Sequence, residues 1–117
     1  GLANATQIGQ TYGAQVDTLG NLYFCDNYGR RIRVVPKADG SVPFAVKGTG
    51  ETVVPAGASL KGRVYRVLGN GAAGEGTMGE KAYDAMIREP YNFHIDADGG
   101  LYLAEFGNNR IVYVATR

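Results

Sequence analysis

A glycine-rich segment carries the most recognisable chemical motif of the sequence, the GxGxxG spacing of Gly69–Gly74. Glycines at this spacing let backbone amides approach a dinucleotide pyrophosphate, provided that a strand precedes the motif and a helix begins at it. A strand-like run does precede it, residues 81–89 could form the helix, and Asp96 lies 22 residues beyond Gly74. However, Gly76 and Gly79 interrupt the place where the helix must begin. We therefore expect no nucleotide site.

His94 and Cys25 are the only residues of their types. A zinc site takes three or four ligands, so His94 cannot form one with other histidines of this sequence. Cys25 lies in an apolar run with no histidine near it, which predicts a small buried residue without a nucleophilic role. A single cysteine also excludes an intramolecular disulfide.

Two acid–arginine pairs recur at the same spacing, Asp26 with Arg31 and Glu105 with Arg110. They could serve as paired carboxylates or as a basic ligand contact. Because the spacing occurs twice, we favour a structural role in which each arginine bridges to an acid on the neighbouring strand.

The charge of the chain argues against nucleic acid as a partner. The densest basic cluster contains Arg30, Arg31, Arg33 and Lys37, with Tyr28 available to stack on a base. The net charge is only +1, however, and no second basic cluster accompanies it. RNA binding is therefore a minor hypothesis for the function.

The composition places the chain among globular proteins. Its 117 residues, 44% hydrophobic and 20% charged, correspond to at most one ordinary domain. No uncharged apolar run approaches the roughly 18–20 residues of a membrane-spanning helix, so we expect no membrane insertion. Eighteen glycines, eight tyrosines and short β-branched runs favour an all-β fold.

The chain repeats itself at an offset of 79 residues, with 12–35 matching 91–114. Eight of these 24 ungapped positions are identical, among them the pairs Asp17/Asp96, Gly20/Gly99 and Tyr23/Tyr102. Each copy predicts three short strands, because two turn signals divide the apolar runs. The first strand of each copy is expected to end at 16–17 or 95–96. The second strand is expected to span 21–26 or 100–105, and the third 31–35 or 110–114.

Both copies resemble NHL repeats, the blades of NHL-type β-propellers. The second copy matches best, through Pro90, Ile95-Asp96, Gly99, Leu101-Tyr102-Leu103, Glu105, Asn108 and Arg110-Ile111. The first has Thr11 in place of the proline and Gly29 in place of the asparagine, and 67–74 resembles the glycine-rich linker between blades of bacterial members. The resemblance implies an all-β fold of antiparallel meander blades, incomplete in this chain.

We accordingly treat residues 1–117 as one partial propeller module of two units. Unit 1 covers about 1–68, with an insertion at 41–61, and unit 2 covers about 69–117. The insertion is expected to form either a hairpin or loop before an outer strand near 63–68, or a longer outer edge of the blade. A propeller takes four to eight blades, more than this chain provides. We therefore expect the chain to be a piece of a longer protein, and a homo-oligomer that closes the ring is the second possibility.

The resemblance implies a non-catalytic binding or scaffolding module with no cofactor, whose ligand is a protein or a glycan. Up-and-down strand order places the second turns, Tyr28–Arg30 and Phe106–Asn109, on one rim with the glycine-rich connection. Tyr28, Arg30, Phe106 and Asn109 are therefore candidate binding residues, and His94 is a fifth because the first strand of each unit would line the propeller axis. A secreted or cell-surface location rests on the resemblance alone.

The runner-up function is a fragment of a propeller enzyme, a metal-dependent lyase or lactone hydrolase. In that case His94 would be one ligand of an axial metal site completed by other blades. Alternatively, His94 is only a hydrogen-bonded side chain near the axis, and we favour this interpretation because the sequence has no second histidine. RNA binding ranks third and would weaken steeply with salt.

Overall fold

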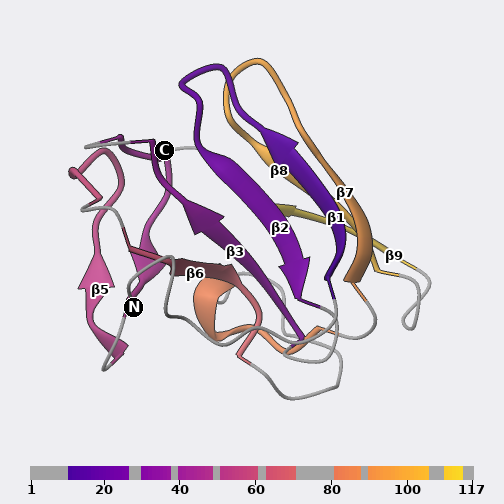
Figure 1. Ribbon diagram of the computed structural model, residues 1–117. Helices are drawn as coiled ribbons and strands as arrows, with labels where there is room; N and C mark the ends of the chain where they lie inside the picture. Colours follow the sequence, from indigo (N-terminus) through magenta and orange to yellow (C-terminus); the bar gives the residue numbers. More distant parts are fainter. Residues whose placement is uncertain are drawn as a thin grey trace.

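The described part of the protein is an all-β fold of two antiparallel sheets (Figure 1). The computed structural model describes residues 11–26, 30–37, 40–48, 51–60, 63–70, 81–87, 90–105 and 110–114, of which 11, 12, 90, 91, 105 and 110 are described by their backbone alone. Within these ranges no α-helix is formed, and the 3₁₀-helix described along its whole length is one turn, η2 (Ala82–Asp84). The helix that a dinucleotide-binding unit would need is thus not formed at 81–87.

The three strands predicted for each repeat are present in both. They form antiparallel meanders in which each strand pairs with the next along the chain. In the first repeat they are β1 (Thr11–Val16), β2 (Leu22–Asp26) and β3 (Arg31–Val35). In the second they are β7 (Pro90–Ile95), β8 (Leu101–Glu105) and β9 (Arg110–Val114).

The insertion lengthens the outer edge of the first sheet. The strand expected near 63–68 is β6 (Tyr65–Leu68), and it pairs with β3 as a fourth strand. The inserted residues form a hairpin of β4 (Val46–Lys47) and β5 (Val53–Val54), and β4 pairs with the far side of β6. The resulting order is β1-β2-β3-β6-β4-β5, so the hairpin precedes β6 in sequence but lies outside it.

The same turn joins the first two strands of both repeats. One carboxylate oxygen of Asp17 accepts hydrogen bonds from the amides of Leu19 and Asn21, and Asp96 does the same for Asp98 and Gly100. The third turn residue is Gly20 or Gly99, each with φ +89°, a conformation that L side chains rarely adopt. The aspartate and the glycine identical between the repeats therefore both belong to the turn geometry.

Each three-stranded sheet has two chemically different sides. We call the side that carries Tyr23 or Tyr102 the tyrosine side, and the side that carries Leu22 or Leu101 the leucine side. Because side chains alternate along a strand, the registers β1-β2-β3 and β7-β8-β9 fix which residues share a side. Burial of these sides differs between the two repeats.

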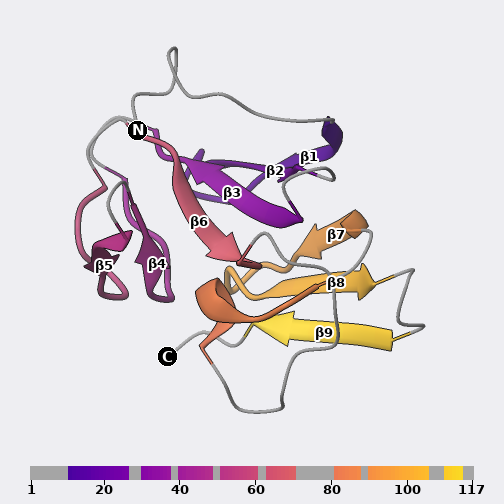
Figure 2. The same cartoon turned by 90° about the horizontal axis from the view of Figure 1, so that it is seen from below.

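In the first repeat the tyrosine side is buried, and the leucine side is buried only at Phe24 and Asp26; in the second repeat the leucine side is buried and the tyrosine side is exposed. The buried tyrosine side and the buried leucine side contribute to one hydrophobic cluster, so the two sheets share a core (Figure 2). The inserted segment and the stretch before β7 also fill it, through side chains such as Phe44, Leu60 and Ile87. The first three strands of each repeat contribute Tyr23, Cys25, Ile32 and Val34 and, from the second repeat, Phe93, Ile95, Leu101, Leu103 and Val114, and strands β4 and β6 add Val46, Tyr65, Val67 and Leu68.

Arg30, the residue that precedes β3, lies beside Gly69 at the start of the glycine-rich connection, where strand order puts it. Gly69 has φ +93°, and a Cβ added to it would overlap the carbonyl oxygen of Arg30. The Gly69 amide donates to the carbonyl of Ala82, which ties η2 to the end of β6. Only glycine permits both this backbone conformation and this close approach.

Asn21 holds the first turn against the inserted segment. Its side chain is fully buried and donates to the Asp17 carboxylate and to the Ser41 carbonyl, each bond shorter than 3.0 Å. Its side-chain oxygen accepts from the Lys37 amide at 3.0 Å. One asparagine thus satisfies groups from three separate stretches of chain.

Asn21→Ala should lower the free energy of unfolding by about 2–4 kcal/mol, because it leaves buried donors and acceptors without partners. Asn92→Ala is the matched control, since Asn92 is exposed and bonds only the adjacent Phe93 amide among the described contacts. We expect the control to lose less than about 1 kcal/mol in urea unfolding. Equal losses in the two variants would contradict the role given to Asn21.

Candidate functional site

A pocket of about 300 Å³ opens where the first turns of the two repeats meet the inserted segment. The turn after β1 supplies one wall and the turn after β7 supplies the opposite wall. The Gly99 turn lies close to Pro43, since an added Cβ would come within 2.8 Å of that ring. The lining residues are Asp17, Thr18, Leu19, Ser41, Val42, Pro43, Gly57, Ala97, Asp98 and Gly99.

The chemistry of this pocket suits recognition. Leu19 is 61% exposed and gives an apolar contact, while Thr18 and Ser41 supply hydroxyl groups. The Asp17 carboxylate is engaged by the turn amides and by Asn21. Asp98 lies on the exposed turn and has no ion-pair partner among the described residues, so its carboxylate can accept hydrogen bonds from a ligand.

Of the five binding residues predicted from sequence, two lie within the described residues. Tyr28, Phe106 and Asn109 lie outside them, so the aromatic rim stays a prediction. Arg30 has φ +52° and its carbonyl lies against Gly69, which places its backbone on the rim expected for it. The pocket, in contrast, is formed by the first turns, which strand order puts at the other ends of the strands.

His94 lies on the exposed tyrosine side of the second sheet, directly across from Tyr102. In the part of the chain that the structure describes, no three His, Cys, Asp or Glu side chains gather as metal ligands would. The only ligand set available to His94 for a metal would thus have to include groups outside these ranges.

Gln15, the register mate of His94, joins the two repeats. Its side-chain amide donates to the Phe93 carbonyl at 2.6 Å, and its side-chain oxygen accepts from the Ile95 amide at 3.0 Å. The amide therefore satisfies two backbone groups along the edge of β7, as a neighbouring strand would. Sequence reasoning missed this residue, although its pairing with His94 in the repeat was the available signal.

Asp26 and Arg31 are backbone partners across β2 and β3, as the repeat predicted. The ion pair of the Asp26 carboxylate is nevertheless with Arg33, at 3.4 Å, which corrects the expected acid–arginine pair. Asp26 is 1% exposed, so the charge requires a close cation. Arg33 takes this role from the same strand, two residues further along. The side chains of Glu105 and Arg110 lie outside what the structure describes.

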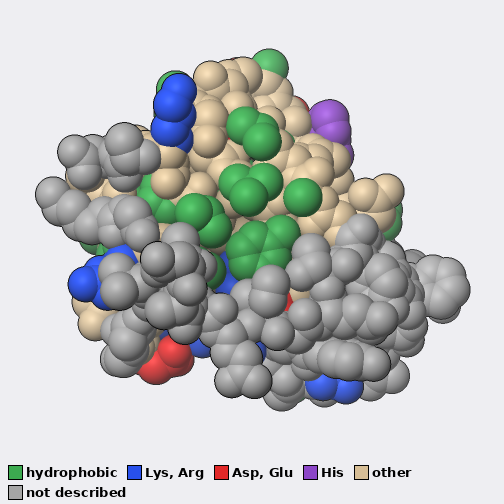
Figure 3. Space-filling model, viewed as in Figure 1, with side chains coloured by type: hydrophobic (Ala, Val, Ile, Leu, Met, Phe, Trp, Pro, Cys, Tyr) green, Lys and Arg blue, Asp and Glu red, His purple; other side chains and the backbone are tan. Residues whose placement is uncertain are grey.

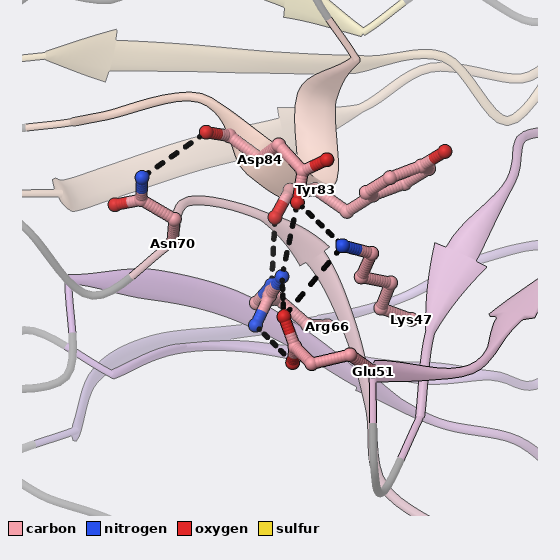
Figure 4. Close-up of polar contacts among 6 residues, drawn as sticks. All are labelled: Lys47, Glu51, Arg66, Asn70, Tyr83 and Asp84. Carbon is pink, nitrogen blue, oxygen red and sulfur yellow. Dashed lines mark hydrogen bonds and ion pairs between the residues drawn. The ribbon is translucent and has the colours of Figure 1, made fainter.

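Four charged side chains form a network that clamps η2 to the outer edge of the first sheet (Figure 4). Arg66 holds Glu51 through two bonds of 2.9 and 3.1 Å, and it also donates to the Tyr83 carbonyl at 2.7 Å. Lys47 pairs with Asp84 at 2.8 Å and lies 5.2 Å from the centre of the Tyr83 ring. Two cations balance two anions, so we assign this network a structural role.

Cys25 is fully buried, as predicted for a small core residue. Burial raises the pKa of its thiol to about 12. The thiolate that a nucleophile requires is therefore strongly disfavoured at neutral pH. Cys25 packs in the core that the two repeats share.

Comparison with known proteins adds no assignment. No family model matches the sequence, and no curated protein matches it significantly. Among the described residues, no helix has the length and apolar character needed to cross a membrane.

Gln15→Ala should destabilise the protein by about 1–3 kcal/mol, because the Phe93 carbonyl and the Ile95 amide lose their partner in a half-buried position. His94→Ala changes the same register position of the other repeat, where the side chain is exposed, and should change stability by less than about 0.5 kcal/mol. Chemical denaturation of both variants measures the contrast. A loss as large in His94→Ala would contradict the distinction.

The network predicts a pH dependence. Hydrogen bonds from Arg66 lower the pKa of Glu51 from its ordinary value of 4.5. The folded state thus binds this proton less tightly than the unfolded state, so the stabilisation is present above pH 4.5 and is lost as the pH falls through the lowered pKa. The stability advantage of the wild type over Glu51→Gln should therefore shrink in urea titrations run at successively lower pH below that value. A difference that stays constant with pH would exclude the coupling.

Proposed function

We propose that this chain is a non-catalytic binding and scaffolding module made of two NHL-type β-propeller blades, with a protein or a glycan as its ligand. The support for the blades is the sequence pattern quoted above, together with the two meanders and their shared turn. The support for binding is the pocket between the first turns. A bacterial cell-surface setting follows only from the resemblance.

The pocket is the single observation that carries the proposal. Its volume of about 300 Å³ is at the lower end for ligand sites, which are concave and combine apolar walls with a few polar groups. It draws on both repeats and on the insertion, so its shape depends on the one segment that departs from the repeat. Loops held on a rigid scaffold are frequent binding sites.

The side chains of the pocket favour a ligand that offers hydrogen-bond donors beside an apolar patch. Asp98 can accept from ammonium, guanidinium or hydroxyl groups, and Leu19 and Pro43 can contact an aliphatic chain or a sugar face. A peptide with a basic residue next to an apolar one meets these requirements, and so does a glycan. The experiment must therefore offer both.

A phage-displayed random peptide library and a glycan array, screened with the purified chain, should yield binders. The double variant Leu19→Ala/Asp98→Asn removes the exposed apolar contact and the carboxylate without touching the hydrogen bonds of the turns. It should weaken a selected binder by at least about tenfold, equivalent to 1.4 kcal/mol, in a titration.

Tyr28→Ala/Phe106→Ala is the matched variant for the opposite rim predicted from sequence. Loss of affinity in this variant alone would move the site to the aromatic rim and away from the pocket. Binders that tolerate both double variants, or screens that yield none, would contradict the proposed binding function.

A further inference from the structure

The tyrosine side of the second sheet is an exposed apolar surface in the described part of the protein. Tyr102, Tyr113 and Ile111 are 40%, 48% and 69% exposed. Register places Tyr113 beside Tyr102 and Ile111 beside Ala104, and the two tyrosine rings lie 4.6 Å apart. Large apolar side chains gathered on one sheet face normally have a partner.

The first repeat shows what covers such a face. Its counterparts at the 79-residue offset are Tyr23, Val34 and Ile32, and all three are fully buried. They lie in one hydrophobic cluster with the leucine side of the second sheet. Within this chain, therefore, a tyrosine side is covered by the leucine side of the next repeat.

The leucine side of the first sheet is exposed at the end next to the first turn, whereas Phe24 and Asp26 on the same side are buried. Val16 is 62% exposed and Leu22 39%, whereas their counterparts Ile95 and Leu101 are buried. Figure 3 shows hydrophobic side chains over β1, β2 and β3 on this face. Two cations, Arg31 and Arg33, lie on this side of β3, and the Asp26 carboxylate pairs with Arg33 at 3.4 Å. The chain thus exposes the tyrosine side of its second sheet and the Val16–Leu22 end of the leucine side of its first sheet, which are parts of the two faces that its internal contact joins.

We propose that a second copy of this chain docks its first sheet, leucine side inward, on the tyrosine side of the β7-β8-β9 sheet. The contact is head to tail, with different faces on the two partners, so it either closes a ring or continues as an open assembly. It repeats the packing between the two units of one chain. The inference uses only the repeat and its burial, and it does not depend on the ligand proposed for the pocket.

Light scattering coupled to size exclusion tests this contact. The mass of the wild type should rise above the 12.4 kDa of one chain as the concentration increases. Val16→Asp breaks the leucine side and Tyr102→Asp breaks the tyrosine side. Each should weaken association by at least about tenfold, because the contact would bury an unpaired charge. Val53→Asp, at an exposed position on β5, is the control that should associate like the wild type.

Mixing the two variants is the decisive measurement. Val16→Asp keeps an intact tyrosine side and Tyr102→Asp keeps an intact leucine side, so an equimolar mixture should form a complex of two chains and stop there. Ile111→Asp replaces Tyr102→Asp if circular dichroism shows that the latter is unfolded. A wild type that stays at monomer mass up to about 1 mM, which corresponds to a binding energy near −4 kcal/mol, overturns the proposal. A mixture that stays monomeric also overturns it and leaves the face to another occupant.

Discussion

The junction between β1 and β7 is the constraint on which the rest of the described structure depends. A three-stranded sheet with one apolar side has nothing within itself to cover that side. Here the tyrosine side of the first sheet and the leucine side of the second remove each other from water in one core. Gln15 fixes how they meet, because its amide satisfies the edge of β7 at two adjacent backbone groups.

The candidate site follows from that junction. Its two walls are the turns after β1 and β7, and each turn is rigid because an aspartate carboxylate bonds its amides. Neither wall belongs to the insertion, yet the insertion closes the pocket between them through 41–43 and Gly57. Asn21 holds the start of the insertion at Ser41, and the charged network around Arg66 holds its middle at Glu51. A change at either anchor should therefore reach the pocket through packing.

Local features could be read from the sequence, and long-range ones could not. The strand ends and the turns with Gly20 and Gly99 follow from alternation and from backbone sterics, which act over a few residues. The position of the inserted hairpin outside β6 depends on which strand edge stays open, and no spacing encodes that. The ion pair of Asp26 with Arg33 depends on how the side chains lie over β3. Of the candidate site, only the presence of the insertion was predicted, since the pocket needs both turns in three dimensions.

Hydrogen exchange of individual amides, followed by nuclear magnetic resonance, tests the central claim that the two repeats form one cooperative unit. The account predicts that the amides of β2 and β8 exchange with the same free energy, because neither sheet keeps its core when the other opens. If the amides of β7, β8 and β9 exchange more than about tenfold faster than those of β2, the free energies of opening differ by about 1.4 kcal/mol. The second repeat would then open alone, which would contradict the claim of one cooperative unit.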